Sequence, residues 1–176
     1  MLRDVNERPY FEVLDGIEYE KVSPNFAHSF VQKAIARIMD ECADGSGAAL
    51  TELHTRVGRV DGTESMLVPD IAFFKIAAIL AFQDEDRLIP PTAPEIAVEI
   101  RSPNDRPGLR EAKIVKYLAT GSRLVLDIDP RTRTVIAHAR DGVQNFARSS
   151  RFTHTQAPWL AFELDDLFRD LDRFHL

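Results

Sequence analysis

A strand, a helix and a second strand follow one another in the middle of this sequence, and this order constrains the fold more than any other feature. Glu95 to Ile100 is apolar apart from its terminal carboxylates, which is typical of a strand covered on both faces. Leu109 to Thr120 has helical spacing and is followed by Gly121, a residue suited to a helix C-cap. The apolar run Leu124 to Asp129 comes next. Two strands joined through a helix suggest a crossover connection, and therefore a sheet with a helix on its face.

Other patterns surround this unit with a hairpin, two helices and further strands. Phe11 to Asp15 and Ile17 to Val22 are separated by Asp15-Gly16, which accepts the positive φ of a tight turn, so we expect an N-terminal β-hairpin. Helices are expected over 26–39 and Leu164–Phe174, strands over Ala48–Val60 (with an interruption near Gly58), Leu67–Phe74, Thr134–Arg140 and Val143–Phe152, and an exposed excursion with a short helix over Ile76–Pro94. These elements predict an α/β or α+β fold, a mixed central sheet flanked by helices.

Length and composition predict an ordinary soluble domain. The chain has 176 residues, of which 44% are hydrophobic and 28% charged, so we expect a single domain spanning 1–176. The lone Cys42 cannot form an internal disulfide, and the N-terminus carries no apolar signal core, which favours a cytoplasmic protein. The longest apolar run, Ile76 to Phe82, is far shorter than the ~18 residues of a membrane span, so no membrane association is expected.

Charge is distributed unevenly along the chain. The net charge is −6, so the surface as a whole repels phosphate, and non-specific coating of DNA is not expected. Between Arg101 and Arg123, however, six basic residues face two acidic ones. This tract could mark a surface that meets a polyanion, although charge alone favours the alternative, a solvated loop and helix face.

Asp70, Glu99 and Lys113 form the combination with the clearest chemistry. Two carboxylates from neighbouring strands can bind one hard divalent cation, while a lysine can hold a phosphate oxygen or an attacking water. Glu99 lies inside an apolar strand, where an unpaired buried carboxylate is costly, so it needs a metal, a cationic partner or access to water. The alternatives are a carboxylate solvated at the strand end and a lysine that lays its stem over the core with its amine in water.

Several other kinds of site lack support in the sequence. The histidines at 54, 138, 154 and 175 have no paired spacing typical of zinc ligands, and no glycine-rich phosphate loop occurs. Cys42 and Ser102 lack the surroundings of a nucleophile. A glycosidase with two carboxylates is possible in principle, but no sugar-stacking aromatic residues surround Asp70 or Glu99.

Motifs along nearly the whole chain resemble a known family. They are Tyr10 to Gly16, Glu20, Ser23-Pro24, His28, Pro69-Asp70-Ile71, Val98 to Pro103, Lys113 with Tyr117 and Gly121, Asp129-Pro130, and a tail with Pro158-Trp159-Leu160 and Leu164 to Phe168. Together they resemble the Uma-two family of restriction-endonuclease-like proteins, within the PD-(D/E)xK nuclease superfamily. The order Pro-Asp, then Glu-x-x-Ser-Pro, then Lys-x-x-x-Tyr-x-x-x-Gly is the most specific part of this match.

The resemblance implies a restriction-endonuclease-like core that hydrolyses phosphodiester bonds with a metal. Asp70 and Glu99 would be the metal ligands, Lys113 the catalytic lysine, and Glu20 an additional acidic residue at the edge of the site. With the main-chain carbonyl of Ile100, the two ligands would hold Mg²⁺ or Mn²⁺. In the superfamily motif the lysine stands two residues after the second acid, and that position is Arg101 here. The lysine would therefore have moved to the following helix.

The same reading makes nucleic acid, and DNA in particular, the expected partner. Arg101, Arg106 and Arg110 would contact phosphates on either side of the scissile one, and the acidic surface suggests a homodimer that combines two basic tracts. His28 is a second-rank candidate that would order water near Glu20 or act in capping or packing. The competing hypothesis is a catalytically inactive member of the same fold that binds nucleic acid or another protein.

Overall fold

The computed structural model describes residues 11–21, 23–60, 63–82, 89–103 and 105–176. The helices are α1 (Phe26–Ala43), α2 (Ile76–Ala81), α3 (Pro107–Thr120) and α4 (Leu164–Arg173). The strands are β1 (Phe11–Leu14), β2 (Ile17–Glu20), β3 (Gly47–Thr51), β4 (Thr55–Val60), β5 (Thr63–Leu67), β6 (Ile71–Lys75), β7 (Ile96–Ile100), β8 (Leu124–Asp129), β9 (Thr134–Ala139), β10 (Gly142–Phe146), β11 (Arg151–His154) and β12 (Ala157–Glu163).

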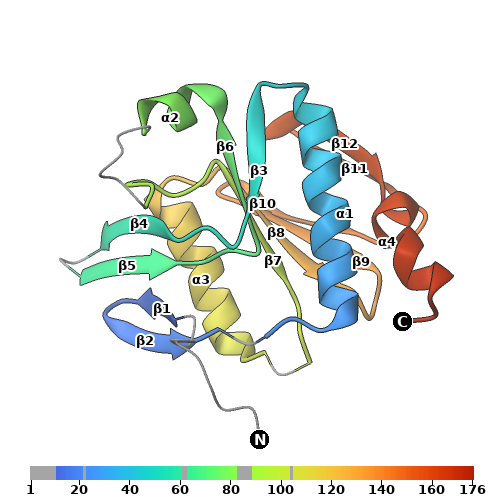
Figure 1. Cartoon of the computed structure of the whole chain (residues 1–176), viewed down its shortest axis with the longest axis horizontal. Helices are drawn as coiled ribbons and strands as arrows, with labels where there is room; N and C mark the ends of the chain where they lie inside the picture. The colour runs from blue at the N-terminus through green and yellow to red at the C-terminus, as the bar shows by residue number, and fades with distance from the viewer. Residues whose placement is uncertain (1–10, 22, 61–62, 83–88, 104) are drawn as a thin grey trace, which may run out of the picture.

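The main sheet has six strands in the order β10-β9-β8-β7-β6-β3 (Figure 1). Strands β7 and β8 are parallel, with Ile96 opposite Leu124 and Ile100 opposite Ile128, and α3 connects them. The other neighbours in this sheet are antiparallel. The predicted crossover and the mixed central sheet are therefore confirmed.

The N-terminal hairpin belongs to a second sheet with the order β2-β1-β5-β4. Asp15 and Gly16 turn the hairpin with φ angles of 51° and 79°, the left-handed conformation for which this dipeptide is suited. Strand β1 also pairs with β5 through Val13 and Met66, so the hairpin is held to the middle of the chain. The predicted hairpin is confirmed. Strands β11 and β12 form a separate pair.

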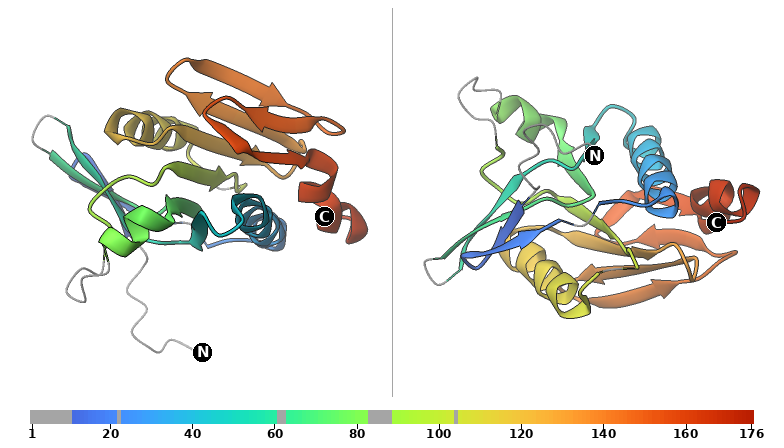
Figure 2. Two further views of the ribbon diagram at one scale, coloured as in Figure 1. Left: turned by 90° about the horizontal axis from the view of Figure 1, so that it is seen from above. Right: turned by 60° about the horizontal axis from the view of Figure 1, so that its bottom comes forward.

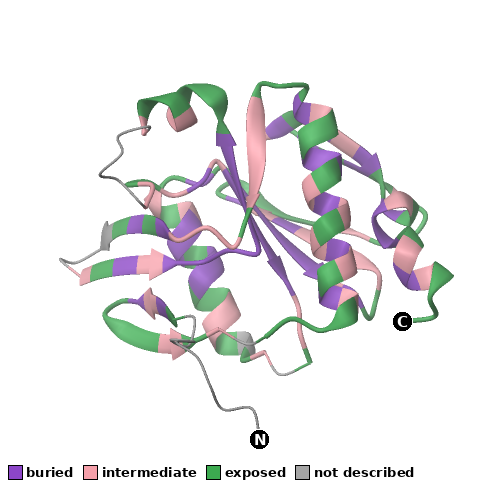
Figure 3. Cartoon of the chain, in the orientation of Figure 1, coloured by how far each residue is buried: buried purple, intermediate pink, exposed green. Residues whose placement is uncertain are grey.

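Helices cover both faces of the main sheet, with α1 on one face and α3 on the other (Figure 2). Alternation along the strands divides the core accordingly: Ile96 and Val98 of β7 pack toward α1, whereas Ala97 packs toward Ile114 and Tyr117 of α3. Strands β6 and β7 are almost wholly buried (Figure 3), as expected for central strands covered twice.

The predicted strand over Leu67–Phe74 is confirmed only for residues 71–74, which belong to β6, because the chain changes sheets before Ile71. Strand β5 ends at Leu67 and β6 begins at Ile71. Pro69 has no N–H group with which to join a strand ladder. Side chains instead form the hydrogen bonds of the neighbouring backbone groups. Glu12 accepts from Val68 N, Lys21 donates to Val68 O, and Gln32 donates to Asp70 O. This junction positions Asp70.

Two further boundaries differ from the prediction. Ala48–Val60 divides into β3 and β4 at residues 52–54, whereas Gly58 lies within β4 with a φ of 70°, where the register with β5 shifts. Val143–Phe152 divides into β10 and β11, and β12 was not predicted as a strand.

The short helix predicted after Ile76 is α2. Of the helices in the described residues, none combines the length and the apolar character needed to cross a membrane.

Candidate active site

Asp70 lies at the junction between the two sheets, next to the end of β7. Its Oδ2 accepts a hydrogen bond of 2.6 Å from the backbone N–H of Ile100 and lies 3.1 Å from Nε2 of His28. Its Oδ1 lies 2.9 Å from Nζ of Lys21. The carboxylate is buried, with 3% of the residue exposed, and three donors from three segments fix its orientation.

Glu99 is buried in β7 and meets α3. Its Oε2 lies 2.7 Å from Nζ of Lys113, and its Oε1 accepts a hydrogen bond of 3.0 Å from the hydroxyl of Tyr117. Residues four apart on a helix lie on one face, so Lys113 and Tyr117 reach the same carboxylate from successive turns. The sequence hypothesis that Glu99 needs a cationic partner is consistent with this ion pair.

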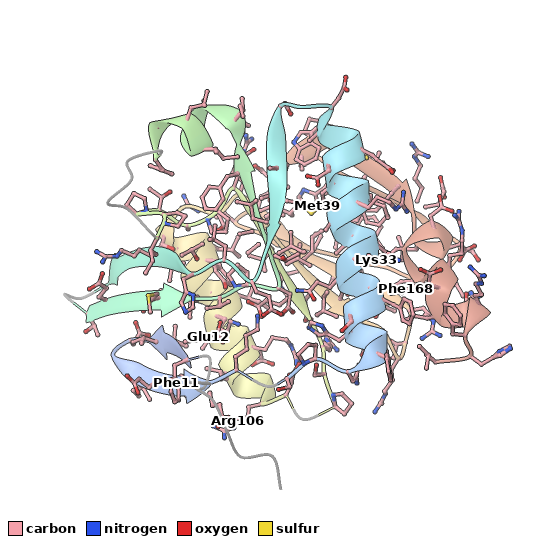
Figure 4. All side chains as sticks on the ribbon, in the orientation of Figure 1. Phe11, Glu12, Lys33, Met39, Arg106 and Phe168 are labelled. Atoms are coloured by element: carbon pink, nitrogen blue, oxygen red, sulfur yellow. The ribbon has the colours of Figure 1, made fainter. Side chains whose placement is uncertain are left out.

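Glu12 of β1 is the third carboxylate at the site, and no role was predicted for it from the sequence. Its Oε1 lies 2.8 Å from Nζ of Lys113 and accepts a hydrogen bond of 2.8 Å from Val68 N. Figure 4 labels Glu12 between the hairpin and α3. Alternation along the sequence gives no signal for Glu12, because the opposite face of β1 carries Phe11 and Val13 and is the more apolar one. The structure nevertheless buries Glu12 and Leu14, so a carboxylate occupies a core position.

Lys21 is the second amine at the site; it is partly buried, and it was also missed. It follows β2 and bridges Asp70 and the backbone carbonyl of Val68, the latter at 2.8 Å. His28, the second-rank candidate, lies against Asp70 on the first turn of α1, and its backbone N–H is capped by the side chain of Asn25. The structure thus brings His28 to Asp70, and His28 and Glu20 line the same cavity.

Burial and neighbouring charges separate the acidities of the two central carboxylates. Burial raises the pKa of Glu99 to about 7, with the charges of Asp70 and Glu12 adding to the shift against the opposing effect of Lys113. Burial also acts to raise the pKa of Asp70, but Lys21 and His28 outweigh it and hold that pKa well below its usual range. Asp70 is therefore ionised at neutral pH, whereas Glu99 titrates near neutrality.

The amine of Lys113 stays charged. Burial acts to lower its pKa, but Glu99 and Glu12 outweigh the burial and raise the pKa of Lys113 above its ordinary value. The pKa of Lys21 is raised in the same way, with Asp70 and Glu99 opposing the effect of burial. Both amines are therefore hydrogen-bond donors and positive charges, and neither is a proton acceptor.

These groups line one cavity of about 150 Å³. It contains Glu12, Lys21, His28, Asp70, Glu99, Ile100 and Lys113, with Glu20, Ser102, Asp105, Arg106, Leu109 and Arg110 completing its wall. The three residues proposed from the sequence as the chemical centre, Asp70, Glu99 and Lys113, are thus brought together. Glu20 is exposed on β2 at the rim, and Arg106 lies at the start of α3 (Figure 4).

The basic tract does not act as one surface. Arg106 and Arg110 line the cavity, but Arg101 pairs with Asp127 at 2.7 Å and with Asp129 at 3.4 Å and lies outside this cavity wall. Further along, Lys116 pairs with Asp15, and Arg123 approaches Glu95 at the opposite end of β8. Only part of the tract can therefore meet a ligand at the site.

The oxygen atoms at the site fit a hard divalent cation. Across the described ranges, no group of three or more His, Cys, Asp or Glu side chains is arranged to hold a metal ion. Mg²⁺, however, needs only one or two carboxylates and takes its other ligands from water and substrate oxygens. Asp70 and Glu99 face the same cavity. Oδ1 of Asp70 and both carboxylate oxygens of Glu99 each have one contact described above, so each can accept one more, whereas Oδ2 of Asp70 already has two. Two carboxylates and the Ile100 carbonyl are therefore a chemically suitable set.

Comparisons with known proteins agree with this fold. The Uma2 family model, described as "Putative restriction endonuclease", matches residues 2–165. A crystal structure from Anabaena variabilis ATCC 29413, of "a putative nuclease belonging to DUF820", superposes with a TM-score of 0.80. It is 22% identical and covers 96% of this chain and 94% of that chain, a similarity that establishes the shared fold. No curated protein matches the sequence.

Proposed function

The chain belongs to the Uma2 family of restriction-endonuclease-like proteins, and from that premise we propose that it is a metal-dependent nuclease that hydrolyses phosphodiester bonds, with DNA as its substrate. One observation carries this proposal: Asp70, Glu99 and Lys113 line the same cavity, with the amine of Lys113 only 2.7 Å from Glu99. Two acids and a fixed cation in one buried cavity are what hydrolysis of a charged ester requires.

Asp70, Glu99 and the carbonyl of Ile100 would hold Mg²⁺ or Mn²⁺. When bound, such an ion offsets charge on the phosphate and makes a coordinated water more acidic. Asp70 is suited to this task because Lys21, His28 and the N–H of Ile100 keep it ionised and fixed. Glu99 ionises near neutrality and would become a ligand in its charged form.

Lys113 would hold a phosphate oxygen or the attacking water. Because its pKa is raised, it would act through its positive charge and its N–H donors and would not remove a proton from the water. Glu12 would keep the amine in place while Glu99 serves the ion. Glu20, Arg106 and Arg110 lie around the cavity, where Glu20 could order a water and the arginines could contact flanking phosphates.

Calorimetric titration of the metal-free protein with Mn²⁺, combined with cleavage assays, tests this proposal. The wild-type protein should take up Mn²⁺ and cleave duplex or single-stranded DNA, and Asp70→Ala and Glu99→Ala should abolish both. Glu18→Ala, an exposed acid on β2, is the matched control and should behave as the wild type. Metal uptake that persists in both site variants would place the metal elsewhere and contradict the proposal. RNA substrates in the same assay test the preference for DNA.

The alternative is a catalytically inactive binding module on the same fold. The observation that favours it is that Lys21 and Lys113 already neutralise Asp70 and Glu99 without a metal. In that case the wild-type protein would be folded, would show no uptake of Mn²⁺ and would cleave no nucleic acid. The same titration therefore separates the two functions.

We also propose a homodimer, since a net charge of −6 disfavours tight binding of nucleic acid by one copy alone. Sedimentation of the purified protein measures this directly, and a mass of 19.9 kDa in solution would contradict it.

A further inference from the structure

A second, larger pocket adjoins the catalytic cavity. It encloses about 600 Å³, and Ser102, Asp105 and Arg110 line both spaces, so a ligand could pass from one into the other. Its wall also comes from the start of α1, the turn between β8 and β9, the segment after β10 and Leu176. In Figure 1 these segments lie toward the lower end of α1 and the C-terminus.

Arginine dominates this wall, and we call the space the arginine pocket. Five arginine side chains line it against two aspartates: Arg101, Arg110, Arg131, Arg133 and Arg148 against Asp105 and Asp129. The side chains of the wall thus carry a surplus of three positive charges in a chain whose net charge is −6. Four separate segments contribute arginines, so the fold concentrates charge that the sequence disperses.

Acidic partners behind the wall hold several of these arginines in place. Arg101 is fixed by Asp127, and Arg133 and Arg148 both contact Asp172 of α4. Each guanidinium has five N–H donors, so such an anchor orients the group and leaves further donors for a ligand. The anchors reduce the net charge but preorganise the recognition surface.

Arg131 differs from these anchored arginines. Its side chain is exposed and, within the ranges that the structure describes, forms no ion pair, while its backbone N–H donates to Asp129 Oδ1 at 2.9 Å. The backbone is therefore held by the turn, and the guanidinium is available for a ligand. Charge-assisted, bidentate pairing with phosphate is the interaction for which such an arginine is best suited.

We propose that the arginine pocket binds the phosphodiester backbone of a nucleic-acid strand beyond the scissile phosphate, with Arg131 making a direct phosphate contact. This inference rests on the proposed function, because it extends the path of the substrate from the catalytic cavity. Arginines from several segments suit a polymer with repeated phosphates better than a single small anion, which one or two of them would satisfy.

Fluorescence anisotropy in EDTA tests the pocket without cleavage. The probes are a fluorescein-labelled 20-base-pair DNA duplex and the corresponding single strand, titrated with wild-type protein, Arg131→Glu, Arg131→Lys and Arg123→Glu. Arg123 is the matched control, since it is also exposed but lies at the opposite end of β8. Circular dichroism verifies that each variant is folded.

Arg131→Glu should weaken binding by roughly tenfold and reduce the slope of log K against log salt by about one. Arg131→Lys should retain most of the affinity, and Arg123→Glu should remain within about twofold of the wild type. Equal weakening by Arg131→Glu and Arg123→Glu would overturn the proposal, because it would reflect overall charge. Failure of the wild-type protein to bind either probe at low salt would overturn it as well.

Parallel cleavage assays distinguish the two proposals. Binding that depends on Arg131 in a protein that cleaves nothing supports the pocket and contradicts the nuclease. If the wild-type protein cleaves nucleic acid and the Arg131→Glu variant binds and cleaves equally well, the nuclease is supported and the pocket is contradicted.

Discussion

Lys113 and Glu12 lie 101 residues apart in the sequence, yet the amine of one is 2.8 Å from a carboxylate oxygen of the other. Both side chains are buried. The contact ties the N-terminal hairpin to α3 and sets the position of the amine that faces Glu99.

Replacement of Glu12 tests whether this contact positions the lysine. Glu12→Gln should reduce kcat by about tenfold, because the amine loses one of its two charged anchors, while the affinity for Mn²⁺ stays near that of the wild type. Steady-state kinetics and calorimetry measure the two quantities. Glu18→Gln on the exposed face of the hairpin is the control. An equal loss in kcat and in Mn²⁺ affinity would instead indicate that Glu12 is a metal ligand.

Loss of the lysine itself should affect both catalysis and folding. Lys113→Met should reduce cleavage at least about 100-fold, because the charge and the N–H donors that stabilise the transition state are lost. It should also destabilise the protein by about 3 to 5 kcal/mol at pH 8, because two buried carboxylates lose their cation.

The destabilisation should be smaller at pH 5.5, where Glu99 can take up a proton. Urea denaturation at the two pH values measures the difference. Lys33→Met, at an exposed position on α1, should change neither activity nor stability. A loss of stability that does not depend on pH would show that the role of Lys113 is packing alone.

The raised pKa of Glu99 predicts a stability that changes with pH in the metal-free protein. In the folded state this pKa is about 7, whereas the ordinary value, which applies to the unfolded chain, is 4.5. Between these pH values the folded protein therefore binds more protons than the unfolded chain does. The contribution of Glu99 to stability should therefore fall as the pH rises from about 4.5 to 7.

Asp70 contributes with the opposite sign. Its folded pKa is lowered, so its stabilising contribution is present above its ordinary pKa of 3.8 and is lost only as the solution becomes strongly acidic. Denaturation curves of wild type and Glu99→Gln between pH 4.5 and 8 separate the two, and the variant should lack the component assigned to Glu99. An unchanged pH profile in Glu99→Gln would contradict this assignment.

Tyr117 offers a test of the hydrogen bond to Glu99. Tyr117→Phe removes the hydroxyl that lies 3.0 Å from Oε1 and should cost about 1 to 3 kcal/mol, since the acceptor remains buried. It should also raise the pKa of Glu99 further, because a donor to the charged form is lost. Carbon-13 spectra of labelled glutamate report the titration. Tyr19→Phe, on the hairpin, should leave it unchanged.

The sequence was sufficient for the centre of the fold and the site. The crossover from β7 through α3 to β8 followed from apolar runs and a helix terminator that depend on local physics. Asp70, Glu99 and Lys113 could be proposed because a carboxylate within an apolar strand and a lysine on an apolar helix row each demand a partner. Their catalytic roles remain predictions.

The missed features depend on contacts between distant segments. Lys21 and Glu12 reach the site only because β1 pairs with β5, and no local pattern specifies that pairing. The change of sheet at Pro69 was missed although Pro69 and Asp70 interrupt the apolar run between Leu67 and Phe74. Strand β12 was missed because Pro158 interrupts its pattern, although this proline lies at an exposed position where an unpaired edge tolerates it.

The junction of residues 68–70 has one more consequence. Glu99 lies in the main sheet and Asp70 at the junction directly before β6, while Glu12 lies in the hairpin of the other sheet and Lys21 directly follows it. The alignment of the acids and amines is thus a property of how two sheets are joined. A slip of one sheet against the other by a single residue would dismantle the centre while leaving each sheet intact.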